Sequence, residues 1–476
     1  MAMLETIKKE RIEKIEAFRK KGIDPFATKS KRDTMADDIV KDYSKYEGKS
    51  VVVAGRLMSF RDFGKIAFSQ LKDGSGSVQL YLKQDVLKNW DDLKLFDVGD
   101  IVDAGGKVTK TKTREISVEV EQLDILTKAI RPLPEKWEGL KVVEERYRKR
   151  YLDILLNEES KKRLVARANI VKAIREFLWG KGFVEVDTPI LQPMYGGTNA
   201  KPFTTHVDSL GMTAYLAIAN ELYLKRVIVG GIENVFTIGR LFRNEGVDKS
   251  HNPEFAMLET MSAYQNYEYN MDLTEDMYKY ICDKVFGKYT FKIAGQDVDF
   301  SKKWSRIKIV DYVKKKKKLD FDKMTLEEAN KELKKVDIES QESVGEALIE
   351  YFEKVLGPTL IQPTIVYGHP VEISPLCKRI PGDEKYVERF EVYIAGMETG
   401  DNWTELNDPI ELYDRFKADQ EREDAHPNDM EFVEAMEYGM APTTGLGPGI
   451  ERVAMMLTET ENIDDIIWFP LMKPKK

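Results

Sequence analysis

The chain has few of the residues that most often carry metal or nucleophilic chemistry: four histidines and two cysteines in 476 residues. Cys282 and Cys377 lie far apart and form no C-x-x-C pair, which argues against a zinc site or a disulfide framework and suits a reducing cytoplasm. So few histidines leave little material for a His-centred triad. No apolar run reaches the length of a membrane span, and the charged start LETIKKERIEKIEAFRKK is unlike a signal peptide, so we expect no membrane partner.

Two common phosphate-binding motifs are also missing. Gly445, Gly447 and Gly449 alternate with other residues, but the segment lacks the third glycine of a dinucleotide fingerprint and the Lys-Ser/Thr of a P-loop. Its glycines allow a ligand to approach the backbone closely, and Arg452 follows in the first turn of an expected helix. Together these features favour an anion site. A tight turn leading into a core helix is the alternative interpretation.

The remaining composition is that of an ordinary globular protein, with 42% hydrophobic and 33% charged residues. A chain of this length exceeds a single core, so we expect two or three domains. The net charge of −8 argues against indiscriminate nucleic-acid binding, although a local basic face could still meet an RNA.

The order of helix-like and strand-like segments along the chain predicts an α+β protein with several domains. Residues 1–48 read as a helical extension, and residues 49–130 hold five short strand candidates separated by turns, typical of an OB-fold barrel. Residues 131–150 read as a linker. We expect residues 151–476 to form one larger domain with an antiparallel sheet flanked by helices, interrupted by a mostly helical insertion at about 266–366.

The segment VFTIGRLFRNEGVDKSHNPEFAMLE, residues 235–259, predicts a long β-hairpin. Its two ends are strand-like, whereas its middle is rich in Asn, Gly, Asp, Ser and Pro. Arg243 and Glu245 lie two residues apart where the first strand ends, so an extended backbone points both to the same side. A guanidinium beside a carboxylate on a sheet suits binding of a phosphate. A solvated ion pair on a surface loop is the alternative.

Carboxylates form a second constellation. Glu391 and Glu398 flank Gly396, and a turn there would bring them together, with no basic neighbour of their own, as a magnesium site. Glu221 and Glu259 lie in strand-like segments, where acids are costly unless a metal or a cationic ligand neutralises them. Acids that face solvent are the alternative.

Three segments carry a resemblance to a known family: GFVEVDTPIL with Pro189, FRNEGVDKSHNPEFAMLE, and GLGPGIERVAMML. ANELYLKR, HPVEISPL, TELNDP and WFPLMKP extend the match over almost the full length. In this order, the segments make the chain resemble a class II aminoacyl-tRNA synthetase of the bacterial lysyl branch. The resemblance implies that the barrel binds the anticodon and that the larger domain is catalytic.

The resemblance implies a cytoplasmic homodimer that uses ATP and Mg²⁺ to convert L-lysine to lysyl-adenylate and passes the lysyl group to the 3′ end of tRNA(Lys). The implied catalytic residues are Arg243 and Arg452, and the implied ATP ligands add Glu245, His251, Asn252, Phe255 and Glu391. The implied magnesium ligands are Glu391 and Glu398, and the implied amino-acid pocket holds Gly197, Glu221, Glu259, Met261, Trp403 and Glu405. The implied anticodon contacts are Arg56, Phe68, Gln79 and Glu121.

Two positions depart from the family pattern. Met261 stands where the family generally has tyrosine, and Asp401-Asn402-Trp403 stands where it has Asn-Ala-Phe. Both changes fall in the implied amino-acid pocket, so they bear on affinity and selectivity for lysine. Two other functions stay open: a paralogue that gives lysine to another acceptor, and a degenerate synthetase kept as an RNA-binding protein.

Overall fold

The computed structural model describes residues 2–134, 142–198, 200–374, 376–419 and 429–475. The chain divides into two compact units, unit 1 (residues 1–140) and unit 2 (residues 141–476). The predicted linker partly falls on residues 135–141, outside the described residues, and partly on helix α4 of unit 2. None of the described helices combines the length and the apolar character needed to cross a membrane.

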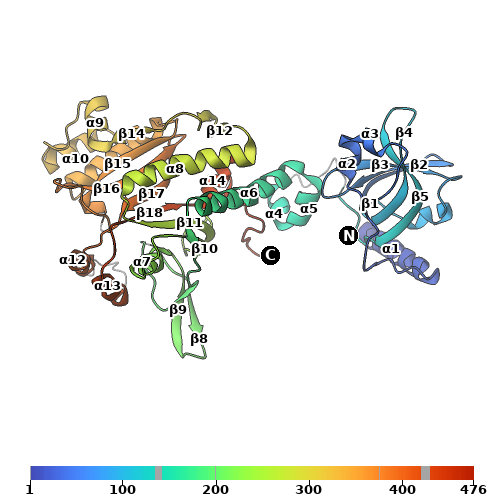
Figure 1. The fold of residues 1–476 in the computed structure, drawn as a ribbon, viewed down its shortest axis with the longest axis horizontal. Helices are drawn as coiled ribbons and strands as arrows, with labels where there is room; N and C mark the ends of the chain where they lie inside the picture. The colour runs from blue at the N-terminus through green and yellow to red at the C-terminus, as the bar shows by residue number, and fades with distance from the viewer. Residues whose placement is uncertain (1, 135–141, 199, 375, 420–428, 476) are drawn as a thin grey trace. The chain divides into compact units, whose positions relative to one another are not determined.

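Unit 1 is built on a closed five-stranded barrel with the strand order β1-β2-β3-β5-β4 (Figure 1). The strands are Ser50–Asp62 (β1), Ile66–Lys72 (β2), Ser77–Lys83 (β3), Ile101–Lys110 (β4) and Ile116–Thr127 (β5), and the helices are Ala2–Lys20 (α1), Ala36–Lys41 (α2) and Tyr43–Tyr46 (α3). In β2, Ala67, Ser69 and Leu71 are buried while the residues between them are more exposed, so one side of the strand fills the barrel. The OB-fold prediction is confirmed.

Unit 2 contains an eight-stranded sheet in the order β14-β15-β16-β17-β18-β11-β10-β6. Pairing is antiparallel except at the two edges, where β14 runs parallel to β15 and β6 runs parallel to β10. Its strands are Val184–Glu185 (β6), Asn234–Phe242 (β10), Glu254–Ala263 (β11), Ser305–Lys308 (β14), Thr364–Pro370 (β15), Tyr386–Ile394 (β16), Met397–Thr404 (β17) and Thr443–Pro448 (β18). The predicted sheet is confirmed, with one parallel strand added at each edge.

Smaller strands and helices surround this sheet. The strands are Leu191–Gln192 (β7), Thr204–Val207 (β8), Met212–Leu216 (β9), Thr290–Ile293 (β12) and Gln296–Asp299 (β13). The α-helices are Val143–Arg148 (α4), Arg150–Leu156 (α5), Glu158–Gly180 (α6), Glu221–Val229 (α7), Tyr267–Ile281 (α8), Ile309–Lys317 (α9), Leu326–Lys334 (α10), Val344–Tyr351 (α11), Pro409–Asp419 (α12), Met430–Glu437 (α13) and Ile450–Leu457 (α14). Helices α8 to α11 lie in the interval predicted as a helical insertion, and short strands β12 to β14 lie among them.

The two faces of strand β11 have different surroundings. Its residues Ala256 and Leu258 are buried in a cluster with side chains of α6 and α8, and these two helices run along that face (Figure 1). Because side chains alternate along a strand, the odd-numbered residues of β11 point to the other face. A cavity lies on that face.

Candidate active site

The odd-numbered residues of β11, from Phe255 to Met261, line a cavity of ≈ 380 Å³. Its walls come from segments far apart in the chain: Gly197 and Thr198, the start of α7 at Glu221, the hairpin residues Arg243 to Phe255, β17 with Glu398 to Trp403, Glu405, and the β18–α14 segment with Gly445 to Arg452. Most of the residues that the sequence predicts for ATP and the amino acid therefore meet in one place.

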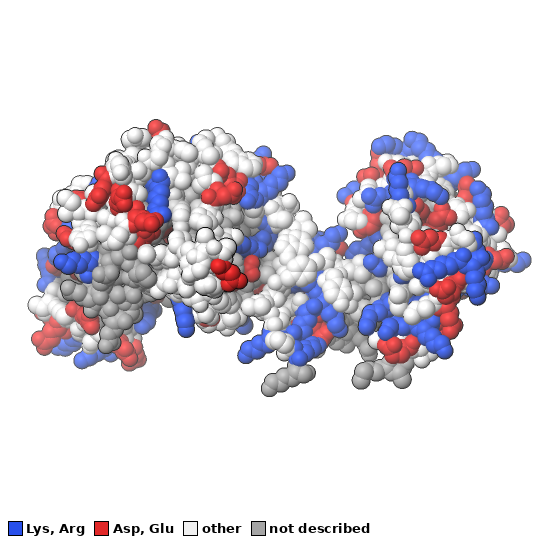
Figure 2. Space-filling model, turned by 90° about the horizontal axis from the view of Figure 1, so that it is seen from below, with Lys and Arg blue, Asp and Glu red and all other residues white. Residues whose placement is uncertain are grey.

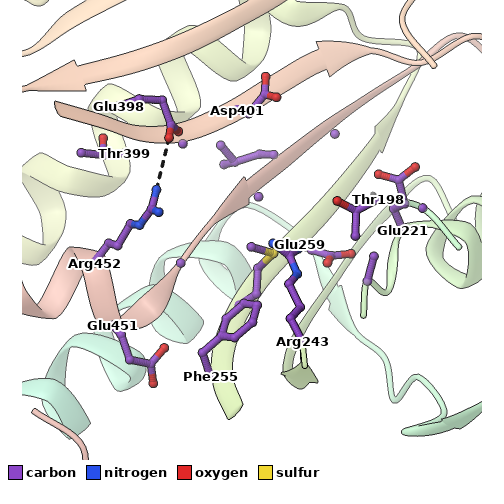
Figure 3. Close-up of a pocket in the computed structure, with 18 of the residues that line it drawn as sticks. Thr198, Glu221, Arg243, Phe255, Glu259, Glu398, Thr399, Asp401, Glu451 and Arg452 are labelled. Atoms are coloured by element: carbon purple, nitrogen blue, oxygen red, sulfur yellow. Dashed lines mark hydrogen bonds and ion pairs between the residues drawn. The ribbon is translucent and has the colours of Figure 1, made fainter. Parts of the chain in front are cut away.

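Arg243 directly follows β10 and enters the middle of the cavity. Its Nε and Nη2 atoms both donate to the backbone carbonyl of Ile218 at 3.4 Å, and its guanidinium carbon lies 5.1 Å from the centre of the Phe255 ring. Figure 3 shows Arg243 beside Glu259. These contacts hold a permanent positive charge in a half-buried position, where charge acts more strongly than in water.

The loop between β10 and β11 is held by Asp248. This carboxylate accepts a 2.8 Å hydrogen bond from the backbone N–H of His251 and lies 2.9 Å from its ring Nδ1. The other ring nitrogen lies 3.4 Å from Nη2 of Arg452, so the loop reaches the start of α14. His251, Asn252 and Glu245 line the cavity.

Arg452, in the first turn of α14, donates to Oε2 of Glu398 at 3.2 Å (Figure 3). The preceding residue, Glu451, is buried and accepts hydrogen bonds from Arg167 of α6 at 2.5 Å and from the Ala256 N–H at 2.8 Å. Glu451 thus ties the start of α14 to α6 and β11, which sets where Arg452 can reach.

The expectation that the acidic pair has no basic neighbour is wrong. Oε1 of Glu391 lies 3.0 Å from Nη2 of Arg389 and 3.2 Å from Nε2 of His369. Arg389 is two residues earlier on β16, so both side chains leave the same face of the strand; His369 comes from the adjacent strand β15. Burial acts to raise the pKa of Glu391, but His369 and Arg389 together outweigh it and lower the pKa.

Glu391 and Glu398 lie in neighbouring strands that differ in access to the cavity. Glu398 lines the cavity, whereas Glu391 is not part of its wall. Burial and the charge of Glu391 raise the pKa of Glu398 to about 7, against the effect of Arg452. Among the described residues, no group of three or more His, Cys, Asp or Glu side chains is arranged to hold a metal ion.

Three of the carboxylates that line the cavity are Glu221, Glu259 and Glu405. Lys225, one turn after Glu221 on α7, is buried, and its Nζ lies 3.1 Å from Oε1 of Glu221 and 2.6 Å from Oε2 of Glu405. The backbone of Gly197 lies close to the Glu221 side chain, because a Cβ at Gly197 would lie 3.1 Å from Cγ of Glu221. The φ angle of Gly197, +89°, also favours glycine.

Of the residues that depart from the family pattern, Trp403 contacts this acidic cluster and Met261 lies in the cavity wall. Met261 is buried in the wall, and the Trp403 indole N–H donates to Oε2 of Glu405 at 2.8 Å. Asp401 also lines the cavity, but both of its oxygens accept hydrogen bonds from Arg389, at 2.7 and 2.8 Å.

The predicted anticodon residues lie on unit 1. The Phe68 ring stacks on Tyr81 of the adjacent strand, with centroids 5.1 Å apart and an angle of 5° between the planes. Gln79, two residues before Tyr81, accepts a hydrogen bond from a serine hydroxyl of β5 at 2.9 Å. Arg56 donates to a backbone carbonyl just before β4 at 2.6 Å, and Glu121 is half-buried on β5. On the face that Figure 2 draws, basic and acidic side chains are interspersed over this unit.

Besides Arg389 and His369, the partners of Glu391, the sequence prediction does not include Lys225, Glu451 and Tyr81. The interpretation of Glu221 as part of a strand-like segment is wrong, because Glu221 begins helix α7. Lys225 follows it by four residues on that helix, a spacing at which helical side chains meet, and the strand interpretation concealed this contact. Tyr81 follows Gln79 by two residues and shares its side of the strand. The role of Glu451 depends on Arg167 of a distant helix, which no local pattern reveals.

Comparison with known proteins adds two family matches. Residues 142–473 match the family model of class II tRNA synthetases (D, K and N), and residues 51–126 match that of the OB-fold nucleic acid binding domain. Similar curated proteins include the lysine–tRNA ligase of Staphylococcus aureus, 42% identical over 98% of this chain and 98% of that protein. The lysine–tRNA ligase of Syntrophomonas wolfei subsp. wolfei is 44% identical over 98% of this chain and 97% of that protein.

Proposed function

The chain belongs to the class II tRNA synthetase family, and we propose that it is a lysine–tRNA ligase, which activates L-lysine with ATP and transfers the lysyl group to the 3′ end of tRNA(Lys). The observation that carries this proposal is that two arginines, Arg243 and Arg452, and three carboxylates, Glu221, Glu259 and Glu405, line one and the same cavity. The arginines suit phosphates and a carboxylate, and the acids suit a substrate with two ammonium groups.

The phosphate end of the cavity is assigned to ATP. Arg243 would bind the α-phosphate and Arg452 the γ-phosphate, with Phe255 against the adenine base. Glu245, His251 and Asn252 line the same end of the cavity and supply polar groups around the nucleotide. The cationic contact between Arg243 and Phe255 keeps the guanidinium aligned before ATP arrives.

Mg²⁺ would be held at the same end of the cavity by Glu398, which lines it, and by Glu391, which lies behind the wall. The mutual repulsion that helps raise the pKa of Glu398 is a reason for a divalent cation to bind there, and carboxylate oxygens are the ligands magnesium prefers. When bound, the ion would neutralise charge on the triphosphate. Arg452, which donates to Glu398, is the residue assigned to the γ-phosphate.

Lysine activation needs no general base, because the substrate carboxylate is already a nucleophile at neutral pH. One of its oxygens forms a bond to the α-phosphorus of ATP, and the bond from that phosphorus to the bridging oxygen of pyrophosphate breaks. Arg243 stabilises the charge that develops at the α-phosphate, so catalysis rests on in-line positioning and electrostatics.

The anticodon of tRNA(Lys) is assigned to unit 1. Phe68, with the stacked Tyr81, offers an aromatic surface for an unpaired base, and Gln79 and Arg56 supply hydrogen-bonding groups on the same barrel, with Glu121 as a further contact. The barrel counts against a paralogue with another acceptor. The arginines and acids retained in the cavity count against a degenerate RNA-binding protein.

A homodimer and a cytoplasmic location complete the proposal. Several apolar side chains around the end of α6 and the following strands are exposed, among them Trp179 (52%), Val184 (47%) and Leu191 (52%), and such a patch suits a partner subunit. Cys282 and Cys377 are buried free thiols, as in proteins of reducing compartments. Sedimentation should give twice 54.8 kDa, and a monomeric mass at micromolar concentration would count against the dimer.

ATP–pyrophosphate exchange tests the activation step. With lysine, ornithine, arginine and the other amino acids offered singly, lysine should support the fastest exchange. Arg243→Ala should lower lysine-dependent exchange at least ~100-fold, because it removes a preorganised charge at the α-phosphate. Exchange near the wild-type rate in this variant, or a better substrate than lysine, would refute the proposal.

A further inference from the structure

Glu405 is held in place by two donors that contact the same oxygen. Lys225 Nζ lies 2.6 Å and the Trp403 indole nitrogen 2.8 Å from Oε2. Glu405 is 1% exposed, so these contacts replace water and fix the orientation of the carboxylate. They leave its other oxygen, Oε1, for something else.

Oε1 of Glu405 is a buried acceptor for which the described part of the chain supplies no hydrogen-bond partner. It faces β18, since a Cβ added to Gly445 would lie 2.6 Å from it, and the same position is 3.1 Å from Cε and 3.2 Å from Sδ of Met261. All three residues line the cavity. Neither the Cα side of Gly445 nor the Met261 thioether offers an N–H or O–H donor to this oxygen, and leaving such an atom unpaired is costly.

We propose that Trp403 and Lys225 are positioning residues that present Oε1 of Glu405 as the acceptor for the side-chain ammonium of the substrate. The inference rests on the proposed function and adds the residues that set selectivity within it. Lys225 itself is not part of the cavity wall; it lies behind the wall and bridges Glu221 to Glu405. One buried ammonium thereby sets the spacing of two carboxylates that line the pocket.

The charges of the pocket agree with this arrangement. In their ionised forms, Glu221, Glu259 and Glu405 together with Lys225 leave two negative charges, which match the two ammonium groups of lysine. An amino acid of the same length without the side-chain ammonium, norleucine, would leave Oε1 buried and unpaired. A site built around a polar partner rejects an analogue that lacks it far more strongly than an apolar pocket rejects a missing methylene.

Trp403→Phe tests the proposal because it keeps an aromatic ring and removes the indole N–H. The KM for lysine in pyrophosphate exchange should rise roughly tenfold or more, the loss expected for a hydrogen bond to a charged group, while kcat changes less than about twofold. The Ki of norleucine should stay unchanged, because norleucine makes no contact with Oε1. A general repacking of the pocket would weaken both amino acids alike.

Trp304→Phe is the matched control. Trp304 is buried in the core of unit 2, and its indole nitrogen has no hydrogen-bond partner among the described residues, so the same truncation removes no contact to Glu405. Lysine should raise the melting temperature of wild type and Trp304→Phe equally and that of Trp403→Phe less, which reports binding without catalysis.

A lysine KM in Trp403→Phe within about twofold of wild type would overturn the inference, and so would equal losses for lysine and norleucine. The rate of lysine-dependent pyrophosphate exchange by the wild type distinguishes failure of the positioning role from failure of the proposed function. If the wild type activates lysine and Trp403→Phe does so equally well, only the positioning role fails. If the wild type does not activate lysine, the proposed function fails as well.

Discussion

Glu259 illustrates how a single buried carboxyl can be held ready for a cation. Burial and the charge of Glu221 raise its pKa to about 8, although the backbone N–H of Asn220 and the charges of Arg243 and Lys225 oppose this. At neutral pH the empty pocket therefore holds a proton on Glu259 for most of the time. An arriving ammonium group favours the ionised form, so binding of the substrate and loss of the proton are linked.

The linkage predicts that the KM for lysine falls as the pH is raised from about 6 to about 8. Below the pKa of Glu259, binding must first remove a proton, at a cost of up to about tenfold in affinity per pH unit. The lysine ammonium, with an ordinary pKa of ~10.4, stays charged throughout. KM should be measured by pyrophosphate exchange at saturating ATP. Glu259→Gln should bind lysine more weakly and with a flatter pH profile; a flat wild-type profile would contradict the prediction.

At the scale of elements, the local sequence pattern determines which face of a strand a side chain is on, whereas the strand order determines which distant residues it meets. The five barrel strands and the β10–β11 hairpin were predictable because alternation along a strand is local. Phe255, Met257 and Glu259 alternate along β11, and the structure has them in one cavity wall. The partners of Glu391 were predictable only in part. Arg389 is close in sequence, but His369 reaches Glu391 through the pairing of β15 with β16.

Strands β2 and β3 of the barrel carry a prediction for tRNA. Phe68→Ala should lower kcat/KM for tRNA(Lys) by roughly 5- to 150-fold, the range expected when about 1–3 kcal/mol of base stacking is lost. Lysine-dependent pyrophosphate exchange should not change, because Phe68 belongs to a different unit from the cavity. Aminoacylation of a tRNA(Lys) transcript measures the effect.

Phe26→Ala provides the control for Phe68→Ala. Phe26 is another partly exposed phenylalanine of unit 1 (40%), but it pairs with the end of β5 through an isolated bridge and was not predicted to contact the anticodon. Equal losses in the two variants would indicate a general effect on the barrel and contradict a stacking role for Phe68.

At the scale of the whole molecule, each unit has a hydrophobic core of its own. One buried cluster lies entirely in unit 1, and three others lie entirely in unit 2. Every residue that lines the cavity also belongs to unit 2. Because cores are the main source of folding free energy, unit 2 should fold and hold its cavity without the barrel.

This separation of the cores predicts that a fragment of residues 141–476 keeps lysine activation and loses tRNA charging. Pyrophosphate exchange should stay within a few-fold of the full chain, since Arg243, Arg452 and the acidic pocket are all retained. Aminoacylation should fall by more than about 100-fold, because the stacking and hydrogen-bonding contacts assigned to the anticodon are all removed together. Both rates should be measured on a fragment that unfolds cooperatively. Loss of exchange in such a fragment would mean that unit 1 contributes to the chemistry of activation and not only to recognition of the tRNA.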